Sequence, residues 1–111
     1  MNLIYHDPSI SHDEAASLFD SGLEENIVTA LISIGLNEQN SAWAQAICLK
    51  HLESGTQSVA AAAIIALGHV VRRFGELEMQ AVMPALDSVK GKSPALEATV
   101  ADTLDDIEMF T

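Results

Sequence analysis

The chain has 111 residues, of which 49% are hydrophobic, and it carries 16 acidic side chains against five lysines and arginines. This length predicts one domain over residues 1–111, and the hydrophobic content excludes a disordered acidic tail. The net charge of −11 excludes nucleic acid as a partner, because phosphate backbones bind lysine and arginine.

Apolar residues recur with helical spacing along the whole chain. Val59, Ala63, Leu67, Val70 and Phe74, for example, follow one another at intervals of three or four residues. We therefore predict an all-α fold of about six helices, and the short links between them make consecutive helices antiparallel neighbours. The predicted helices span residues 11–20, 23–34, 38–54, 57–74, 77–90 and 94–109.

Capping signals support these boundaries in chain order. Residues 1–10 precede the first helix and form either a flexible arm or a short cap. Ser11, with Glu14 three residues later, forms a capping box at the first helix. Ser93 before Pro94 indicates the start of the last helix, because proline is tolerated at the first helical position. Four glycines are expected just past helix ends in the left-handed conformation: Gly35, Gly55, Gly75 and Gly91.

No segment is typical of a targeting signal or a membrane span. The start of the chain has no basic region of the kind that opens a signal peptide. The longest apolar run, residues 59–67, is much shorter than the roughly 20 residues that a spanning helix needs. We expect a cytoplasmic protein that does not bind membranes.

The second half of the chain contains a weak internal repeat. A shift of 37 residues superposes Leu49 on Leu86 and Leu67 on Leu104. This spacing is close to the length of a HEAT helix pair.

Several segments in the same region resemble small bacterial HEAT-repeat proteins. They are Ala66–Gly75 (ALGHVVRRFG), Val82–Leu86 (VMPAL) and Thr103–Phe110 (TLDDIEMF), with Trp43-Ala44-Gln45 similar to an opening helix. The resemblance covers residues 41–110 and implies a HEAT-like solenoid of antiparallel helix pairs. Many proteins of this group are immunity proteins of toxin systems, including contact-dependent growth inhibition. The resemblance therefore implies a cognate protein toxin as the partner.

Charge is distributed unevenly along the chain. Residues 1–49 contain seven acids and residues 93–111 contain five, and neither segment contains a lysine or an arginine. Residues 50–92 hold all five basic side chains. A surface of one sign repels itself, so the charge serves either solubility or the electrostatic steering of a basic partner.

The predicted last helix carries the densest acidic cluster. Asp102, Asp105 and Asp106 are spaced to share one helical face, near a helix end where the macrodipole disfavours anions. Two explanations are open, namely pairing with Arg72 or Arg73 and contact with a partner. The predicted partner-binding residues are Asp102, Asp105, Asp106, Glu76 and Glu78.

No catalytic, cofactor-binding or metal-binding residues are predicted. Cys48 lies on an apolar face and is expected to be buried and inert, and nothing orients His51 as its base. His69 follows Gly68, where a second helix is expected to approach, and we expect His69 to form a hydrogen bond across that contact. The spacing of His12 and its neighbours matches no metal motif.

The remaining large side chains are expected to pack rather than to bind. Trp43 is interpreted as an inter-helix contact. Met79, Met83 and Met109 are interpreted as gap-filling core residues.

Together, these features lead to one functional hypothesis and one alternative. The hypothesis is an immunity protein that neutralises a toxin, most simply a basic nuclease, by covering its active-site cleft with an acidic surface. The alternative is a non-catalytic adaptor or scaffold subunit that binds through a flatter, apolar contact.

Overall fold

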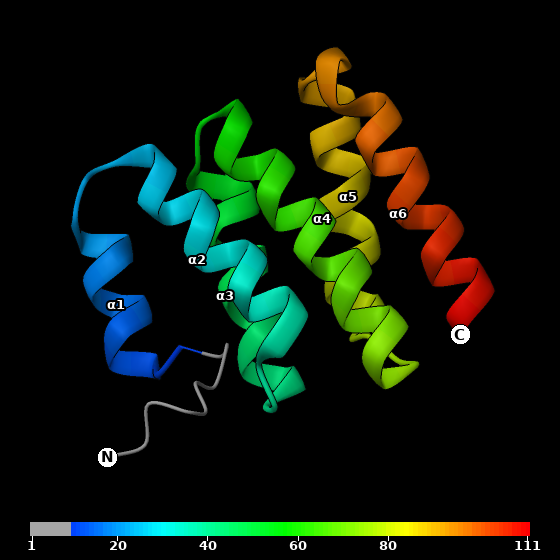
Figure 1. The fold of residues 1–111 in the computed structure, drawn as a ribbon. Coiled ribbons are helices and arrows are strands. Elements are labelled where there is room, and N and C mark those ends of the chain that lie inside the picture. Colours follow the sequence, from blue (N-terminus) through cyan, green and yellow to red (C-terminus); the bar gives the residue numbers. More distant parts are fainter. Residues whose placement is uncertain (1–9) are drawn as a thin grey trace.

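A computed structural model describes residues 10–111 and contains six α-helices and one 3₁₀ turn over that range (Figure 1). This confirms the predicted all-α class and the number of helices. The arm or cap predicted for residues 1–10 lies, apart from Ile10, outside the described residues. The elements are α1 (His12–Asp20), α2 (Glu24–Asn37), α3 (Ser41–Ser54), α4 (Gln57–Phe74), α5 (Met79–Lys92), η1 (Pro94–Leu96) and α6 (Glu97–Phe110).

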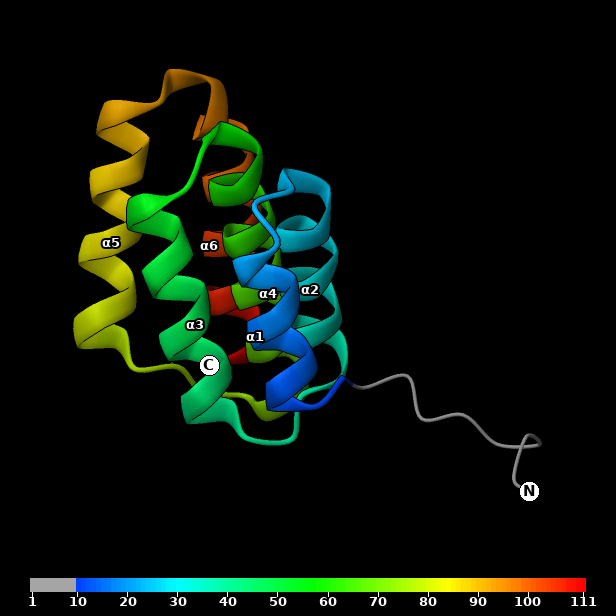
Figure 2. The ribbon, with the colours of Figure 1, turned by 90° about the vertical axis from the view of Figure 1, so that its left-hand side faces the viewer.

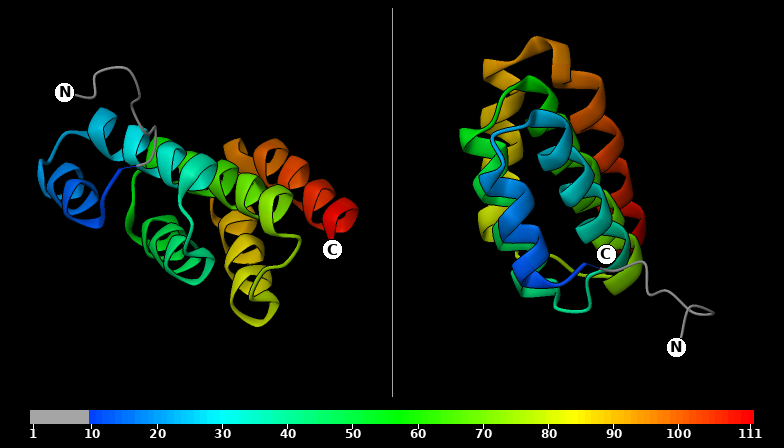
Figure 3. Two further views of the ribbon diagram at one scale, coloured as in Figure 1. Left: turned by 60° about the horizontal axis from the view of Figure 1, so that its bottom comes forward. Right: turned by 60° about the vertical axis from the view of Figure 1, so that its left-hand side comes forward.

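The helices form two layers. Helices α1, α3 and α5 lie in one layer and α2, α4 and α6 in the other (Figure 3). Within a layer the helices run in the same direction, and the two layers run in opposite directions (Figure 1). Figure 2 looks along the stack from the α1 side. The chain therefore forms consecutive antiparallel pairs, from α1–α2 at one end to α5–α6 at the other. None of the described helices is long and apolar enough to cross a membrane.

The internal repeat corresponds to this pairing. A shift of 37 residues moves α3 onto residues 78–91 and α4 onto residues 94–111, which match α5 and η1–α6 to within one residue. The last element begins at Pro94 as predicted, but its first turn is 3₁₀ rather than α-helical.

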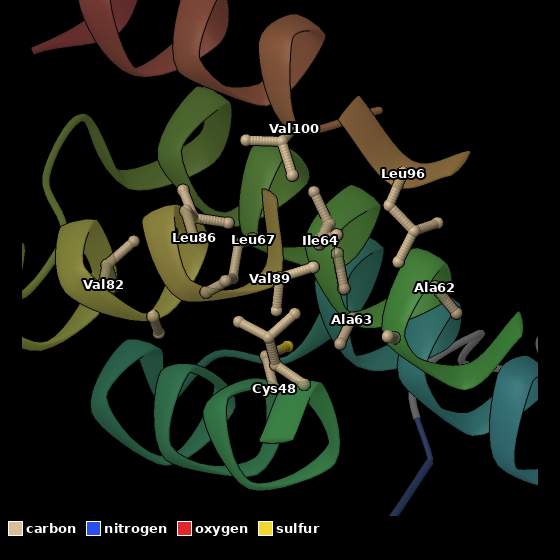
Figure 4. Close-up of a cluster of buried hydrophobic side chains, with 14 of the residues drawn as sticks. Cys48, Ala62, Ala63, Ile64, Leu67, Val82, Leu86, Val89, Leu96 and Val100 are labelled. Carbon is tan, nitrogen blue, oxygen red and sulfur yellow. The ribbon is translucent and has the colours of Figure 1, made fainter. Parts of the chain in front are cut away.

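Helix α4 forms the centre of the core. It packs between α2 and α6 in its own layer and also covers α3 in the other layer. In Figure 4, Ile64 and Leu67 of α4 meet side chains from the neighbouring helices, including Cys48, Leu86 and Val100. Removing this apolar surface from water is the main stabilising term in such a fold.

Two glycines allow the helices of the α2–α4–α6 layer to approach closely. A Cβ atom at Gly35 of α2 would lie 2.8 Å from Cα of Ala66 on α4. A Cβ atom at Gly68 of α4 would lie 3.0 Å from Oδ2 of Asp106 on α6. The approach expected at Gly68 is confirmed. The prediction that Gly35 ends a helix is wrong, because α2 continues to Asn37 and Gly35 is a contact point with α4.

The remaining capping predictions have mixed outcomes. The capping box is confirmed, since the Glu14 N–H donates to Ser11 Oγ (3.0 Å) and the Ser11 N–H donates to Glu14 Oε1 (3.1 Å). Gly75 follows α4 with φ of 75°, in the left-handed region as predicted. Gly55 follows α3 with φ of −87°, and Gly91 lies inside α5, so the left-handed caps predicted at these two positions are wrong.

We expect Gly35→Ala to lower the free energy of unfolding by about 1–3 kcal/mol, because the new methyl group meets backbone that cannot move without separating α2 from α4. Gly91→Ala is the matched control, since a Cβ atom there meets nothing within 4 Å. In a helix this change raises stability by up to about 1 kcal/mol. Urea denaturation of both variants measures the difference, and equal effects at the two sites would contradict the close contact at Gly35.

Candidate functional site

Two of the three aspartates predicted to share one face of α6 line a common hollow, and the third does not. Asp102 and Asp106 line a hollow of about 220 Å³ between α4 and α6, together with Ile65, His69 and Arg72. Asp105 is exposed and does not line this hollow. The structure therefore brings two of the three predicted aspartates together and leaves the third on the outer surface of α6.

One aspartate of the cluster is paired within the fold. Nη2 of Arg72 donates to both carboxylate oxygens of Asp106, at 3.0 and 2.9 Å. Of the two explanations left open for the cluster, pairing with one of the two arginines therefore holds for Asp106. Asp102 and Asp105 are exposed and form no ion pair with any other described residue. These two carboxylates are therefore free to meet a partner.

The second arginine stabilises α2 rather than α6. Nη1 of Arg73 donates to the carbonyl oxygen of Gly35 (3.0 Å), and Nη2 donates to that of Glu38 (2.8 Å). These carbonyl groups lie at the C-terminal end of α2, where the helix dipole favours a cation. Both arginines thus join neighbouring helices. Arg72 neutralises Asp106, and neither arginine is paired with Asp102 or Asp105 among the described residues.

A buried threonine fixes the position of α6 on α4. Oγ1 of Thr103 donates to the carbonyl oxygen of Ile64 at 3.1 Å. Thr103 is not among the residues predicted from the sequence to be important. The sequence feature that could have pointed to Thr103 is its position as a lone hydroxyl in the apolar stripe between Val100 and Ile107. A polar side chain buried in such a stripe needs a hydrogen-bond partner.

The two predicted glutamates lie in different surroundings on the loop between α4 and α5. Both side chains are exposed. Glu76 follows Gly75, where a Cβ atom would lie 3.6 Å from the carbonyl oxygen of Phe110 at the end of α6. Glu78 lies next to α3, because its N–H donates to Oε1 of Gln45 at 2.7 Å. The structure therefore places Glu76 beside the end of α6 and Glu78 against α3.

His69 forms one wall of the α4–α6 hollow. Partial burial lowers its pKa below the usual value, and the neighbouring Arg72 lowers it further, while Asp106 opposes the shift. Because the unfolded chain binds this proton more readily, His69 reduces stability as the pH falls through the ordinary histidine range. The hydrogen bond predicted for His69 is not found among the described residues.

The other residues considered in the sequence, Trp43, His51 and Cys48, pack against neighbouring side chains or are buried. Trp43 packs between helices as predicted, with its ring stacked on that of His12 at a centroid distance of 3.7 Å. His51 lies against Phe19 and has Nδ1 3.0 Å from the carbonyl oxygen of Ile47.

Cys48 is fully buried, and burial raises its thiol pKa to about 12. Within residues 10–111 no three His, Cys, Asp or Glu side chains are grouped to hold a metal ion.

The prediction that the methionines fill the core is wrong. Met79, Met83 and Met109 are 37%, 39% and 76% exposed. They lie on α5 and α6, and among the described residues no further helix pair covers the outer side of these two helices (Figure 1).

Met83 lines a groove of about 410 Å³ between α5 and α6, which we call the α5–α6 groove. Its other lining residues include Pro84, Asp87, Lys90, Val100 and Leu104.

Comparison with known proteins gives one informative match. A chain in the crystal structure of a CDI complex from Cupriavidus taiwanensis LMG 19424 is similar to this chain, with a TM-score of 0.80 and 28% sequence identity. The match covers 96% of each chain, so it extends over all the helix pairs. No family model and no curated protein matches. The resemblance to HEAT-repeat proteins therefore remains a prediction.

We expect Asp106→Asn to lower the free energy of unfolding by up to about 1 kcal/mol, as is typical of a partly exposed ion pair. Asp105→Asn on the same helix is the control, because that carboxylate has no counter-ion among the described residues and lies near the unfavourable end of the helix dipole. Its stability should stay unchanged or rise slightly. Thermal denaturation of both variants at low and high salt measures these changes. The loss of stability caused by Asp106→Asn should become smaller as the salt concentration rises.

We expect Cys48 to react slowly with a thiol reagent at pH 8 in the folded protein, because both the burial and the raised pKa suppress the thiolate. In concentrated guanidinium chloride the reaction should be fast. The chain has no other cysteine, so the absorbance of the released thiolate reports this site alone. Fast reaction of the folded protein would show that Cys48 is accessible.

Proposed function

We propose that this chain is the immunity protein of a CDI system and neutralises a cognate toxin by binding it. The observation that carries the proposal is the similarity, over 96% of both chains, to a chain of a CDI complex. CDI abbreviates contact-dependent growth inhibition, the system to which the sequence resemblance over residues 41–110 also points. The sequence motifs and the match to a solved structure therefore support the same function.

The charge of the chain favours the immunity role over that of the toxin. A toxin that acts on nucleic acid needs a basic surface to hold phosphate groups, whereas this chain has a net charge of −11. A partner of opposite charge would be attracted over several ångströms and would associate faster. We infer that the partner is basic and that a nuclease toxin is the simplest partner of this kind.

The surface that we assign to the partner is centred on α6. Asp102 and Asp105 are exposed and unpaired among the described residues, and Glu76 lies beside the end of the same helix. Asp106, which Arg72 holds in place, is part of the acidic lining of the hollow. Glu78 extends the negative surface toward α3. In this proposal these carboxylates replace the substrate phosphates in the toxin's basic cleft, so that inhibition is stoichiometric.

Co-expression tests the proposed function. Each gene next to the one that encodes this chain is expressed in a host, alone and together with this chain. We expect one neighbouring product to stop growth alone and to be harmless in the presence of this chain. If no neighbour is toxic, or if the toxic product still kills, the immunity function is wrong. A harmless partner held tightly at all salt concentrations would support an adaptor instead.

The electrostatic part of the mechanism has its own test, with purified toxin and stopped-flow kinetics. Asp102→Asn combined with Asp105→Asn should slow association several-fold at low salt and flatten its salt dependence. Asp20→Asn combined with Glu25→Gln is the matched control, since it removes the same charge at the opposite end of the stack. Equal effects of the two double variants would mean that net charge, rather than the α6 surface, attracts the toxin.

A further inference from the structure

We propose that the α5–α6 groove is the apolar anchor site of the toxin complex and accepts aliphatic or aromatic side chains from a toxin segment that also carries lysine or arginine. This inference rests on the proposed function and deepens it by assigning a second contact surface and the chemistry of its occupant.

The shape and lining of the groove fit such an occupant. Its volume is about 410 Å³, which is comparable to that of pockets of roughly 300–1,000 Å³ that hold small molecules. Met83 and Pro84 of α5 are exposed on one side, and Val100 and Leu104 of α6 form the other. Methionine is flexible and polarizable, so it adapts to the shape of an incoming side chain.

No other described helix covers the groove between α5 and α6. The buried stripe of α5, which includes Val82, Leu86 and Val89, packs into the core with α4 and α6 (Figure 4). Met83 and Asp87 are turned away from that stripe and are exposed. Exposed apolar surface that is concentrated in a hollow marks interaction sites on soluble proteins.

The charges around the groove select a basic partner over a second copy of this chain. Asp87 lies in the lining, Asp105 adjoins Leu104, and Glu108 lies one helical turn beyond Leu104 on the same side of α6. Lys90 is the one basic residue of the lining. Two copies, each with a net charge of −11, would bring like charges together at this surface. A toxin segment that places cations beside its apolar side chains would instead meet opposite charges.

The groove is also continuous with the surface assigned above. Helix α6 contributes Asp102 and Asp106 to the hollow on its α4 side and Val100 and Leu104 to the groove on its α5 side. Exposed Asp105 is the residue next to Leu104 in sequence. One toxin surface laid along α6 would therefore reach both, with the carboxylates attracting it and the groove retaining it.

Met83→Ser tests the anchor, with the purified toxin from the co-expression experiment as the probe. The side chain is 39% exposed, so the variant should fold, which circular dichroism checks. We expect dissociation about tenfold faster than for the original chain, with an unchanged salt dependence of association. Met83→Leu should restore most of the affinity. Leu36→Ser is the matched control, an exposed apolar residue on α2, and should change neither rate more than twofold.

The outcomes separate the two proposals. If the original chain binds and neutralises the toxin but Met83→Ser dissociates at the original rate, the anchor site is wrong and the immunity function stands. If the original chain does not bind the toxin, the proposed function itself fails. Sedimentation of the chain alone tests the competing occupant. A dimer that Met83→Ser abolishes would show that a second copy fills the groove, and would overturn the inference.

Discussion

The close packing of α4 against α2 and α6 is the constraint on which the rest of the structure depends. It is possible because small residues lie at the crossings, with Gly35 against Ala66 on one side and Gly68 against Thr103 and Asp106 on the other. Backbones that approach this closely also bring main-chain carbonyl groups within reach of polar side chains. Thr103 reaches the carbonyl oxygen of Ile64, and Arg73 reaches that of Gly35, only because the helices are so near one another.

The same close packing determines which groups the two arginines bind. The chain has five lysines and arginines for 16 acids, and both arginines bind groups on a neighbouring helix or at its end. Arginine suits these positions because its planar guanidinium donates several hydrogen bonds at fixed angles. Arg72 and Arg73 thus stabilise the junctions of α4 with α6 and α2. The carboxylates on the outer side of α6 are left uncompensated, and the self-repulsion that results is acceptable in a fold already stabilised by apolar burial.

The two sides of α6 suit different steps of binding. Charges act over a distance and mainly set how fast a partner arrives, whereas apolar side chains act on contact and mainly set how slowly it leaves. In the proposed complex, Asp102 beside α4 and Asp105 on the outer surface of α6 would attract the toxin. The α5–α6 groove would then hold it. Because both surfaces share one helix, the position of α6 on α4, fixed by Gly68 and Thr103, controls the geometry of the whole interface.

The sequence by itself determined the helices, because helical periodicity and capping are local properties. Six helices, the capping box at Ser11 and the left-handed Gly75 were predicted from neighbouring residues, and the repeat of 37 residues was visible on comparing two halves of the chain. The spacing of the aspartates on α6 left two explanations open, an arginine partner or contact with another protein, and in the structure Asp106 pairs with Arg72.

Only the tertiary structure decided what each helix meets. Gly35 and Gly91 were predicted to end helices, but a glycine inside a helix and one at its end have similar sequence surroundings. The difference at Gly35 is the presence of Ala66 on another helix. Met83 fits the pattern of a core residue, yet it is exposed, since none of the helices in residues 10–111 covers that side of α5. Burial and close approach depend on residues distant in the chain, so the groove and the hollow could be found only once the helices were stacked.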